Sequence, residues 1–255
     1  MKLVRYLYEG KTAYGELVGE AVRPLEGAPY DGVRYAEGEP LPLPSVKLLC
    51  PVAPGKILGI GLNYRDHAIE MKKPLPAEPT VFLKPTSCLV GDGDTVYLPP
   101  LLTHQVEHES ELVVVIGKRA RNVPQEQALA YVLGYTCGND VSARDLQNSG
   151  TQWDFCKGYD TFGPVGPWVE TGLGDGSGLD LTMRVNGQVR QHSNTNQLVF
   201  GVPFLIHYLS QWMTLEPGDI LFTGTPHGVS PLKDGDVMEV EIQGIGVLRN
   251  PVKQG

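Results

Sequence analysis

Two glutamates, Glu109 and Glu111, stand one residue apart before an unbroken apolar run at 112–116. This run is too short for a buried helix and rich in valine, so it predicts a buried strand. Side chains alternate along a strand, so both carboxylates face the same way and repel each other where hydration is lost. A bound divalent cation would stabilise them. The alternative is a strand that enters from solvent with two hydrated acids, and the pair taken alone favours it.

A histidine and a glutamate, His67 and Glu70, form a second possible chemical pair. The segment 62–71 predicts a short helix, and residues three apart share one helical face. A carboxylate that orients an imidazole makes histidine a general base near neutral pH. An ordinary surface pair is the alternative at this spacing. The proline-rich segment 72–79 then predicts a mobile loop, a candidate lid.

Two histidines and a third acid lie close to Glu109 in the sequence. His104 and His108 have the H-x-x-x-H spacing that is typical of zinc sites on a helix. The run continues as a strand, however, which places the two imidazoles out of register for one chelate. Glu107 shares the face of the glutamate pair but lies further from the apolar run, so we expect it to be hydrated.

The elements that position these residues alternate between strands and short helices. Residues 135–142 predict a strand that delivers Asp140, followed by a helical turn at 143–147 and a long polar loop to Lys157. Three segments predict helices, from their caps, prolines and apolar spacing. They are 62–71, capped by Asn63 or Asp66, then 122–134, from an Asn cap to Gly134, and 199–213.

The remaining segments predict a β-rich chain. Strands at 3–8 and 14–18 indicate a small N-terminal β unit, and a proline-rich connector follows it. We therefore divide the chain into residues 1–45 and 46–255. In the last third, Asn186-Gly187 predicts a hairpin turn and 237–242 a half-exposed strand. The expected fold class is α+β and β-rich, with mixed sheets and a few short helices.

The composition excludes several functional classes. The formal net charge of −8 argues against nucleic acid, which requires clustered lysine and arginine. Membrane-length apolar runs and a signal-peptide core are missing, so we expect a cytoplasmic protein with no membrane partner. The four cysteines are widely spaced, and we expect four free thiols packed as small hydrophobes.

Several ordered motifs together resemble the fumarylacetoacetate hydrolase family, from about Lys56 to Pro251. Tyr159 is a mild departure, since the lysine block of the family usually has phenylalanine there. The matching segments are G-x-N-Y-x-D-H-x-x-E-M at 61–71, F-L-K-P at 82–85, H-E-x-E-L-x-V-V-I-G at 108–117, G-Y-T-x-x-N-D-V-S-A-R-D-x-Q at 134–147, K-x-x-D-T-F-G-P-x-G-P at 157–167 and T-G-T-P-x-G-V at 223–229.

The resemblance implies roles for ten residues around one metal ion, which is Mg²⁺ or Mn²⁺, or Ca²⁺ in crystals. Three hard oxygen ligands leave positions for water and substrate, as Mg²⁺ prefers. The implied metal ligands are Glu109, Glu111 and Asp140. The implied catalytic residues are His67, Glu70 and Lys157, and the implied substrate-binding residues are Arg144, Gln147, Thr225 and Lys84. The resemblance also implies the β-roll or sandwich of the family, and a homodimer.

The implied reaction is Mg²⁺-dependent hydrolysis of a C–C bond in a β-diketo acid of the acylpyruvate or fumarylpyruvate type, through a metal-stabilised enolate. The presence of both His67 and Glu70 favours hydrolysis. The alternative is 2-hydroxyhepta-2,4-diene-1,7-dioate isomerisation, or decarboxylation of 5-oxopent-3-ene-1,2,5-tricarboxylate or oxaloacetate, in aromatic-acid catabolism. The partner in either case is a small 2-oxo or 2-hydroxydienoic acid. A third alternative is a metal-stabilised binding domain, but a structural ion requires none of His67, Glu70 and Lys157.

Overall fold

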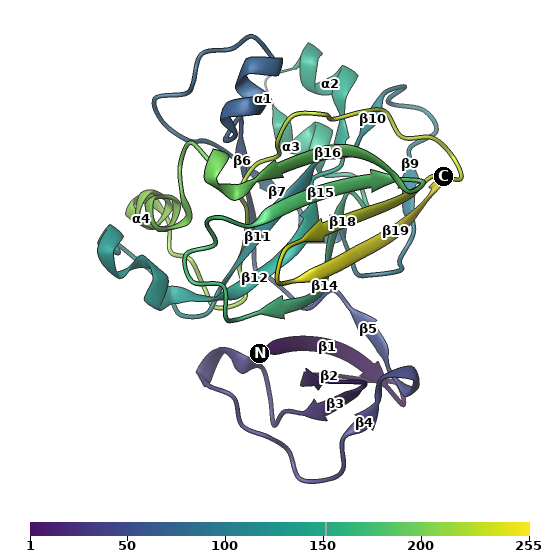
Figure 1. Ribbon diagram of the computed structural model, residues 1–255, viewed down its shortest axis with the longest axis vertical. Helices are drawn as coiled ribbons and strands as arrows, with labels where there is room; N and C mark the ends of the chain where they lie inside the picture. The colour runs from purple at the N-terminus through teal and green to yellow at the C-terminus, as the bar shows by residue number, and fades with distance from the viewer. Residues whose placement is uncertain (151) are drawn as a thin grey trace.

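The computed structural model describes residues 1–150 and 152–255. Its strands form a twelve-stranded sheet, a five-stranded sheet and a two-stranded ribbon, joined by a few short helices. Antiparallel pairs predominate, but β17 with β6, β19 with β9 and β14 with β8 are parallel. The expected β-rich α+β class with mixed sheets is confirmed. Figure 1 shows α1, α2 and α3 at the end of the molecule opposite the N-terminal strands.

The N-terminal strands continue the large sheet. β1 pairs with β14 through Lys2–Glu170 and Leu3–Val169, so the first unit is hydrogen-bonded to the rest of the chain. The boundary between residues 45 and 46 stays a prediction. The elements of this part are β1 (Lys2–Tyr8), β2 (Lys11–Val18), β3 (Ala21–Pro24), η1 (Pro29–Asp31), β4 (Leu41–Pro42), η2 (Leu43–Ser45) and β5 (Lys47–Leu49).

The centre of the large sheet is β11, which is buried on both faces. Leu112, Val114 and Ile116 pack into one hydrophobic core, and Val113 and Val115 pack into another. A strand covered on both sides needs apolar residues at every position, which explains the unbroken run. The other strands of this sheet are β6 (Ile57–Gly61), β7 (Thr80–Lys84), β8 (Leu89–Val90), β12 (Val132–Asn139), β14 (Gly163–Glu170) and β17 (Ile220–Phe222), beside β11 (Ser110–Ile116).

The five-stranded sheet packs its apolar side chains into the first of these cores. The predicted hairpin is confirmed, and both Asn186 (φ +53°) and Gly187 (φ +75°) have the left-handed backbone that its two-residue turn requires. The strands are β9 (Val96–Leu98), β15 (Asp180–Val185), β16 (Gln188–Asn194), β18 (Val237–Ile242) and β19 (Gly246–Gln254), and the separate ribbon consists of β10 (Val106–Glu107) and β13 (Ser142–Ala143).

The helices are shorter than the sequence patterns indicated. Among the described residues, no helix is long and apolar enough to cross a membrane. The predicted helix at 199–213 is confirmed in its main part. The helical elements after the N-terminal strands are α1 (Arg65–Glu70), η3 (Thr86–Cys88), η4 (Gln125–Tyr131), α2 (Arg144–Ser149), α3 (Trp153–Lys157), η5 (Thr195–Gln197) and α4 (Val202–Trp212).

The helix prediction for 122–134 is wrong in type and extent. The segment contains a 3-10 helix, η4, and the chain is already in β12 at Val132, which pairs with Ile116. Gly134 is not a helix cap: a Cβ there would lie 2.4 Å from the carbonyl oxygen of Glu170. Close packing of β12 against β14 therefore requires this glycine, and strand pairing overrides the local helix signals.

Two further local predictions are wrong. Asn63 and Asp66 do not cap α1, whose N-cap is Tyr64 without a side-chain hydrogen bond. Asn63 is buried and instead donates from its amide to the carbonyl of Thr223 at 2.8 Å. The predicted polar loop before Lys157 includes the helix α3. Thr151, which also belongs to the predicted loop, lies outside the described residues.

Candidate active site

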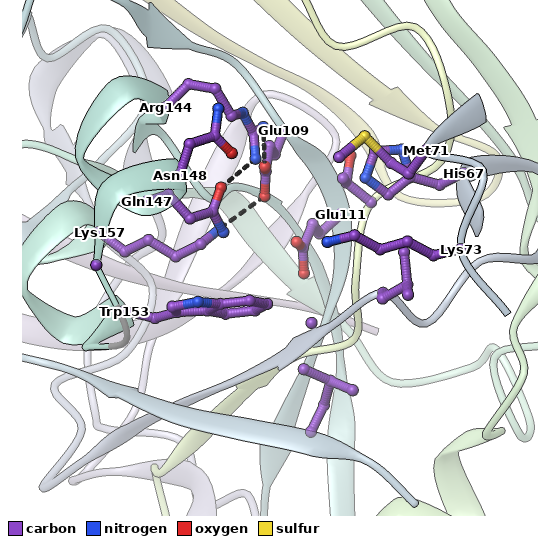
Figure 2. Close-up of a pocket in the computed structure, with 15 residues that line it drawn as sticks. His67, Met71, Lys73, Glu109, Glu111, Arg144, Gln147, Asn148, Trp153 and Lys157 are labelled. Carbon is purple, nitrogen blue, oxygen red and sulfur yellow. Dashed lines mark hydrogen bonds and ion pairs between the residues drawn. The ribbon is translucent and has the colours of Figure 1, made fainter. Parts of the chain in front are cut away.

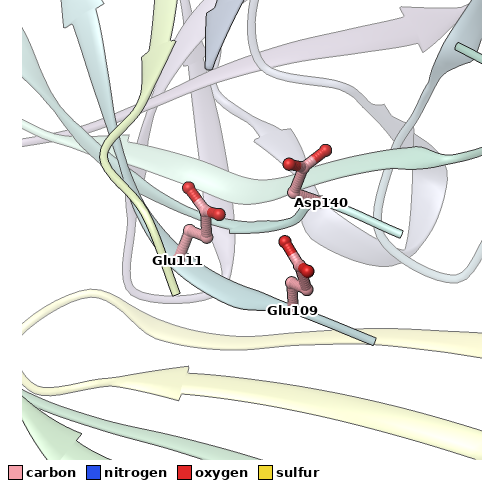
Figure 3. Close-up of side chains that lie close together, drawn as sticks. All are labelled: Glu109, Glu111 and Asp140. Carbon is pink, nitrogen blue, oxygen red and sulfur yellow. The ribbon is translucent and has the colours of Figure 1, made fainter. Parts of the chain in front are cut away.

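Three buried carboxylates meet where β11 begins and β12 ends. Glu109 precedes β11, Glu111 is its second residue, and Asp140 follows β12 directly. The two strands are antiparallel, with Ser110 opposite Asn139, and the Asp140 N–H donates to the carbonyl of Glu109 at 2.8 Å. One carboxylate oxygen of each residue lies within 4.8 Å of the others. Figure 3 shows the three side chains turned towards one another.

Lys157 and Arg144 surround Glu109. The Lys157 ammonium donates to Glu109 at 2.7 Å and to Asp140 at 2.6 Å. The Arg144 guanidinium also pairs with Glu109. Burial alone would raise the pKa of Glu109, but these two cations outweigh it and lower the pKa to about 2. Glu109 is therefore fully ionised at neutral pH.

Glu111 lacks such support. It accepts the N–H of Gly224 at 2.6 Å, but among the described residues no cation pairs with it. Burial, and then repulsion from Asp140 and Glu109, raise its pKa well above the ordinary value. A divalent cation would relieve this repulsion, and three hard oxygen donors match Mg²⁺ or Mn²⁺. The residues present therefore fit a metal ion.

Glu107 is buried, so the expectation that it is hydrated is wrong. Its carboxylate accepts a hydrogen bond from Arg144 Nε at 2.8 Å. One guanidinium thus binds Glu107 and Glu109 together. With all four carboxylates ionised, as a bound dication would require, they exceed the three cations by one negative charge in this cluster, which consists of Glu107, Glu109, Glu111, Asp140, Lys84, Arg144 and Lys157. A dication would convert that charge to a positive one and favour an anionic ligand.

Lys84 is placed behind Asp140, and its contact with substrate stays a prediction. Its ammonium donates to Asp140 at 2.6 Å and to the carbonyls of Lys157 and Phe162 at 2.5 and 3.1 Å. Three acceptors use all three protons of the ammonium group, and its side chain is fully buried. Lys84 therefore holds Asp140 in position and does not line the cavity beside the carboxylates.

His67 and Glu70 face each other on α1, as their spacing predicted. His67 Nδ1 lies 2.9 Å from Glu70 Oε2, and the other carboxylate oxygen accepts the N–H of Gly228 at 3.0 Å. With Nδ1 committed to Glu70, Nε2 is the ring nitrogen that remains for a proton transfer. His67 is buried and lines the same cavity as Glu109 and Glu111.

A cavity of about 290 Å³ brings these groups together. Figure 2 shows Lys157 and Trp153 on one side of it and His67, Met71 and Lys73 on the other. Of the ten predicted site residues, Glu70, Asp140 and Lys84 do not line it, and they contact lining residues or their neighbours. The predicted residues that do line it are His67, Glu109, Glu111, Arg144, Gln147, Lys157 and Thr225.

Gln147 and Thr225 are fixed by neighbours. Gln147 accepts a hydrogen bond from Arg144, three residues earlier on α2. The Thr225 hydroxyl donates to the carbonyl of Ser110 at 3.0 Å and accepts from Gln191 at 2.8 Å. Gln191 also accepts the Ser110 N–H, so it links the start of β11 to the Thr225 loop. The sequence analysis did not single it out.

His108 is a structural residue outside the carboxylate cluster. Its two ring nitrogens lie 3.0 Å from Gln191 Oε1 and 2.8 Å from Ser230 Oγ, and burial lowers its pKa to about 4. A neutral histidine with both nitrogens committed is not available to a metal ion. The rejection of an H-x-x-x-H zinc site agrees with this geometry.

Sequence reasoning missed Trp153, whose ring forms one side of the cavity. A Cβ on Gly61, the last residue of β6, would lie 2.1 Å from that ring. The indole therefore closes over the strand only because residue 61 is glycine. A glycine at a strand end was the available signal, but it does not identify its partner. Met71, Lys73 and Asn148 were also missed as lining residues.

All four cysteines are buried and free, as expected. Burial raises the pKa of the Cys50 thiol to about 12 and that of Cys156 to about 11. Neither thiol is activated as a nucleophile.

Comparison with known proteins places this geometry in context. The fumarylacetoacetate (FAA) hydrolase C-terminal domain matches residues 56–253, and the Rv2993c-like N-terminal domain matches residues 1–51. A 2,4-didehydro-3-deoxy-L-rhamnonate hydrolase of Sphingomonas sp. is 45% identical over 94% of this chain and 86% of its own. The bovine protein named oxaloacetate tautomerase FAHD2A, mitochondrial, is 45% identical, and the match covers 83% of this chain and 71% of the bovine one.

The crystal structure of a 5-carboxymethyl-2-hydroxymuconate delta-isomerase from Mycobacterium smegmatis superimposes with a TM-score of 0.93. It is 39% identical, and the match covers all of both chains. These relatives carry the names of a hydrolase, a tautomerase and an isomerase. With the domain match over most of the sequence, they show that the chain belongs to the fumarylacetoacetate hydrolase family, a family of enzymes.

Proposed function

We propose that this protein hydrolyses a C–C bond in a small β-diketo acid of the acylpyruvate type, with a divalent cation at Glu109, Glu111 and Asp140. The observation that carries the proposal is a histidine–glutamate pair and a carboxylate cluster that share one cavity. A metal-stabilised binding domain would need the carboxylates alone. The His67–Glu70 pair, by contrast, suits a reaction in which a proton is transferred.

The bound cation would act as a Lewis acid for the oxygen atoms of a 2-oxo acid and for the enolate that leaves. The residues of the chain would do the rest. Thr225 and Gln147 both line the cavity. The Thr225 hydroxyl donates its proton to Ser110, whereas the amide nitrogen of Gln147 can donate to the carboxylate or carbonyl of such an acid. The Lys157 ammonium lies beside Glu109 and would stabilise the negative charge that develops on the enolate oxygen.

His67 would take the proton of the attacking water at Nε2. Glu70 holds Nδ1 and stabilises the imidazolium that forms, and the backbone N–H of Gly228 fixes Glu70 in turn. Attack at the carbonyl distant from the 2-oxo acid breaks the C–C bond. The electron pair of that bond passes into the enolate, which is protonated to pyruvate or a similar 2-oxo acid.

A second candidate reaction is isomerisation, tautomerisation or decarboxylation of a related acid. The names of the Mycobacterium smegmatis isomerase and the bovine tautomerase favour it. The same carboxylate cluster would serve an enolate formed by proton transfer or by loss of carbon dioxide. In isomerisation or tautomerisation, His67 would transfer a proton between atoms of the substrate. In decarboxylation, His67 would not be required.

A substrate panel with product analysis separates these candidates. The purified protein is assayed with Mg²⁺ on acylpyruvates, oxaloacetate and a hydroxymuconate-type diacid, and pyruvate, carbon dioxide and the isomerised diene are measured. We expect acylpyruvates to give pyruvate with the highest kcat/KM, and EDTA to abolish the activity. Faster isomerisation or decarboxylation, or activity that EDTA leaves intact, would contradict the proposal.

A further inference from the structure

Among the described residues, Lys73 is the basic residue of the cavity that has no acidic partner. Four basic side chains line the cavity: His67, Lys73, Arg144 and Lys157. His67 faces Glu70, Arg144 binds two glutamates, and Lys157 binds Glu109 and Asp140. Within residues 1–150 and 152–255, no ion pair or hydrogen bond engages the Lys73 ammonium. A cation beside a cavity and without a counterion is available to a ligand.

The backbone turn after α1 sets the direction of Lys73. Lys72 has a left-handed backbone (φ +52°) and donates its N–H to the carbonyl of Ile69 at 3.1 Å. The Lys73 N–H donates to the carbonyl of Ala68 at 3.0 Å. These two bonds are the Schellman termination of a helix, and they tie Lys73 to the helix that carries His67. Lys73 lines the cavity, whereas Lys72 does not.

The position of Lys73 differs from that of the other cations. Lys157 and Arg144 are buried and touch the carboxylates, whereas Lys73 is exposed. In Figure 2 its ammonium extends into the cavity from the side of His67 and Met71, towards Glu111 in this view and opposite Lys157. A ligand held by Lys157 and the carboxylate cluster at one end would thus meet Lys73 on the side of the proposed base.

The cavity is large enough for such a ligand. Its volume of about 290 Å³ equals the space of about ten water molecules in the liquid. A simple 2-oxo acid such as pyruvate would leave much of it filled with water. A longer acid with a second polar end would fill more of the cavity and bring that end within reach of its other lining residues.

We propose that Lys73 binds a second carboxylate at the far end of the substrate, so that the cavity selects dicarboxylic 2-oxo acids over their monocarboxylic counterparts. The inference rests on the proposed function for the orientation of the substrate, but its test does not require hydrolysis. Lys73 is a specificity-determining residue in this proposal and moves no proton.

Equilibrium binding tests the selection with two matched probes. 2-Oxoadipate and 2-oxohexanoate share the 2-oxo acid and the chain length, and differ in a far carboxylate against a methyl group. Their Kd values are measured by calorimetry with Mg²⁺ for the wild-type protein, Lys73→Gln, Lys73→Arg and Lys72→Gln. Lys72→Gln is the matched control, because it removes the same charge from the adjacent exposed residue.

We expect Lys73→Gln to raise the Kd for 2-oxoadipate about tenfold. This is the effect of losing one charge-assisted hydrogen bond to a partly solvated group. Its Kd for 2-oxohexanoate stays within about twofold, and Lys73→Arg keeps most of the preference. Lys72→Gln behaves as the wild type. The proposal is overturned if the wild-type protein binds the two probes equally or binds neither. It is also overturned if Lys73→Gln raises the Kd values for both probes alike.

Kinetics separate this proposal from the proposed function. Fumarylpyruvate, which ends in a carboxylate, and acetylpyruvate, which ends in a methyl group, are assayed with the same variants. Lys73→Gln raises the KM for fumarylpyruvate and leaves both kcat values nearly unchanged. If neither compound is hydrolysed, the proposed function fails, while the calorimetric preference still decides the role of Lys73.

Discussion

The two sides of the cavity are built differently. The carboxylate side consists of Glu109, Glu111 and Asp140 at the junction of two central strands, buried and fixed by backbone pairing. The other side is α1, a helix of six residues whose Ile69 is 77% exposed. Side-chain contacts, such as that of Glu70 with Gly228, hold α1 to the rest. The fold itself thus positions the proposed metal ligands, and a few local contacts position the proposed base.

This contrast assigns stability and chemistry to different residues. On the strand side, buried charges depend on one another, so a substitution should affect both folding and activity. On the α1 side, the contacts are fewer and more exposed, so a substitution should affect activity with little change in stability. Four substitutions examine this contrast, from the largest expected effect to the smallest.

Glu109→Ala should have the largest effect. It removes a proposed metal ligand and leaves Lys157 and Arg144 without their shared carboxylate. We expect kcat/KM to fall at least about a thousandfold on every substrate, since losing even a hydrogen bond around a metal site costs 10- to 100-fold. Steady-state kinetics and Mg²⁺ calorimetry measure this. Glu216→Ala, at an exposed acid, is the control, and activity retained in Glu109→Ala would break the assignment.

Lys84→Met should lower stability most among the variants that keep the proposed metal ligands. It removes the buried partner of Asp140 and keeps the volume of the side chain. We expect the free energy of unfolding to decrease by about 3 kcal/mol, because Lys157 still pairs with Asp140. Urea denaturation measures it. Lys47→Met breaks an exposed pair with Asp94 and should cost below about 1 kcal/mol; equal losses would contradict the contrast in burial.

Glu70→Gln examines the α1 side. Its carboxylate is 37% exposed, so its loss should change the free energy of unfolding by less than about 0.5 kcal/mol. Hydrolysis should still fall about tenfold in kcat, because His67 loses the group that stabilises its charged form. Glu78→Gln, at another exposed acid, is the control. A large loss of stability would show that α1 is not the loosely attached side.

Glu111→Gln should change the stability by only about 1 kcal/mol in the absence of metal, and the sign of the change depends on the metal ion. A carboxyl whose pKa is raised in the folded state holds its proton more tightly there, so ionisation above its ordinary value of 4.5 opposes folding. Glutamine removes this penalty. In EDTA at pH 7 we expect the Tm to rise by roughly 2–4 °C, or about 1 kcal/mol, and the gain to shrink towards pH 4.

In millimolar Mg²⁺ the wild-type protein should have the higher Tm of the two, because only the wild-type protein gains stability from tight binding of Mg²⁺. Thermal denaturation in both buffers measures the two differences. A Glu111→Gln variant that is less stable than the wild type in EDTA would contradict the repulsion among the three carboxylates.

Much of the strand side was predictable from the sequence, and much of the α1 side was not. The valine run before Gly117 predicted one strand, and the segment that delivers Asp140 predicted another; their antiparallel pairing came from the structure. Burial of Glu107 was not predictable, because it depends on Arg144, which reaches it from another element. Likewise, Lys84 lies behind Asp140 through packing that no local pattern encodes.

Long-range packing also explains the other errors. Residues 122–134 carry helix signals, yet Val132 belongs to a strand because it pairs with Ile116. Trp153 lies over Gly61, which is 92 positions earlier in the sequence. The residues that line the cavity beyond the motifs come from such contacts, and one sequence does not show them.

The most direct test of the division between the two sides is the ratio of two reactions in His67→Ala. Acylpyruvate hydrolysis and oxaloacetate decarboxylation are measured with Mg²⁺ in this variant, with exposed His104→Gln as the control. If α1 activates water and the carboxylate side supports the enolate, hydrolysis falls at least about a hundredfold and decarboxylation stays within about threefold. Equal loss of both reactions would contradict the account.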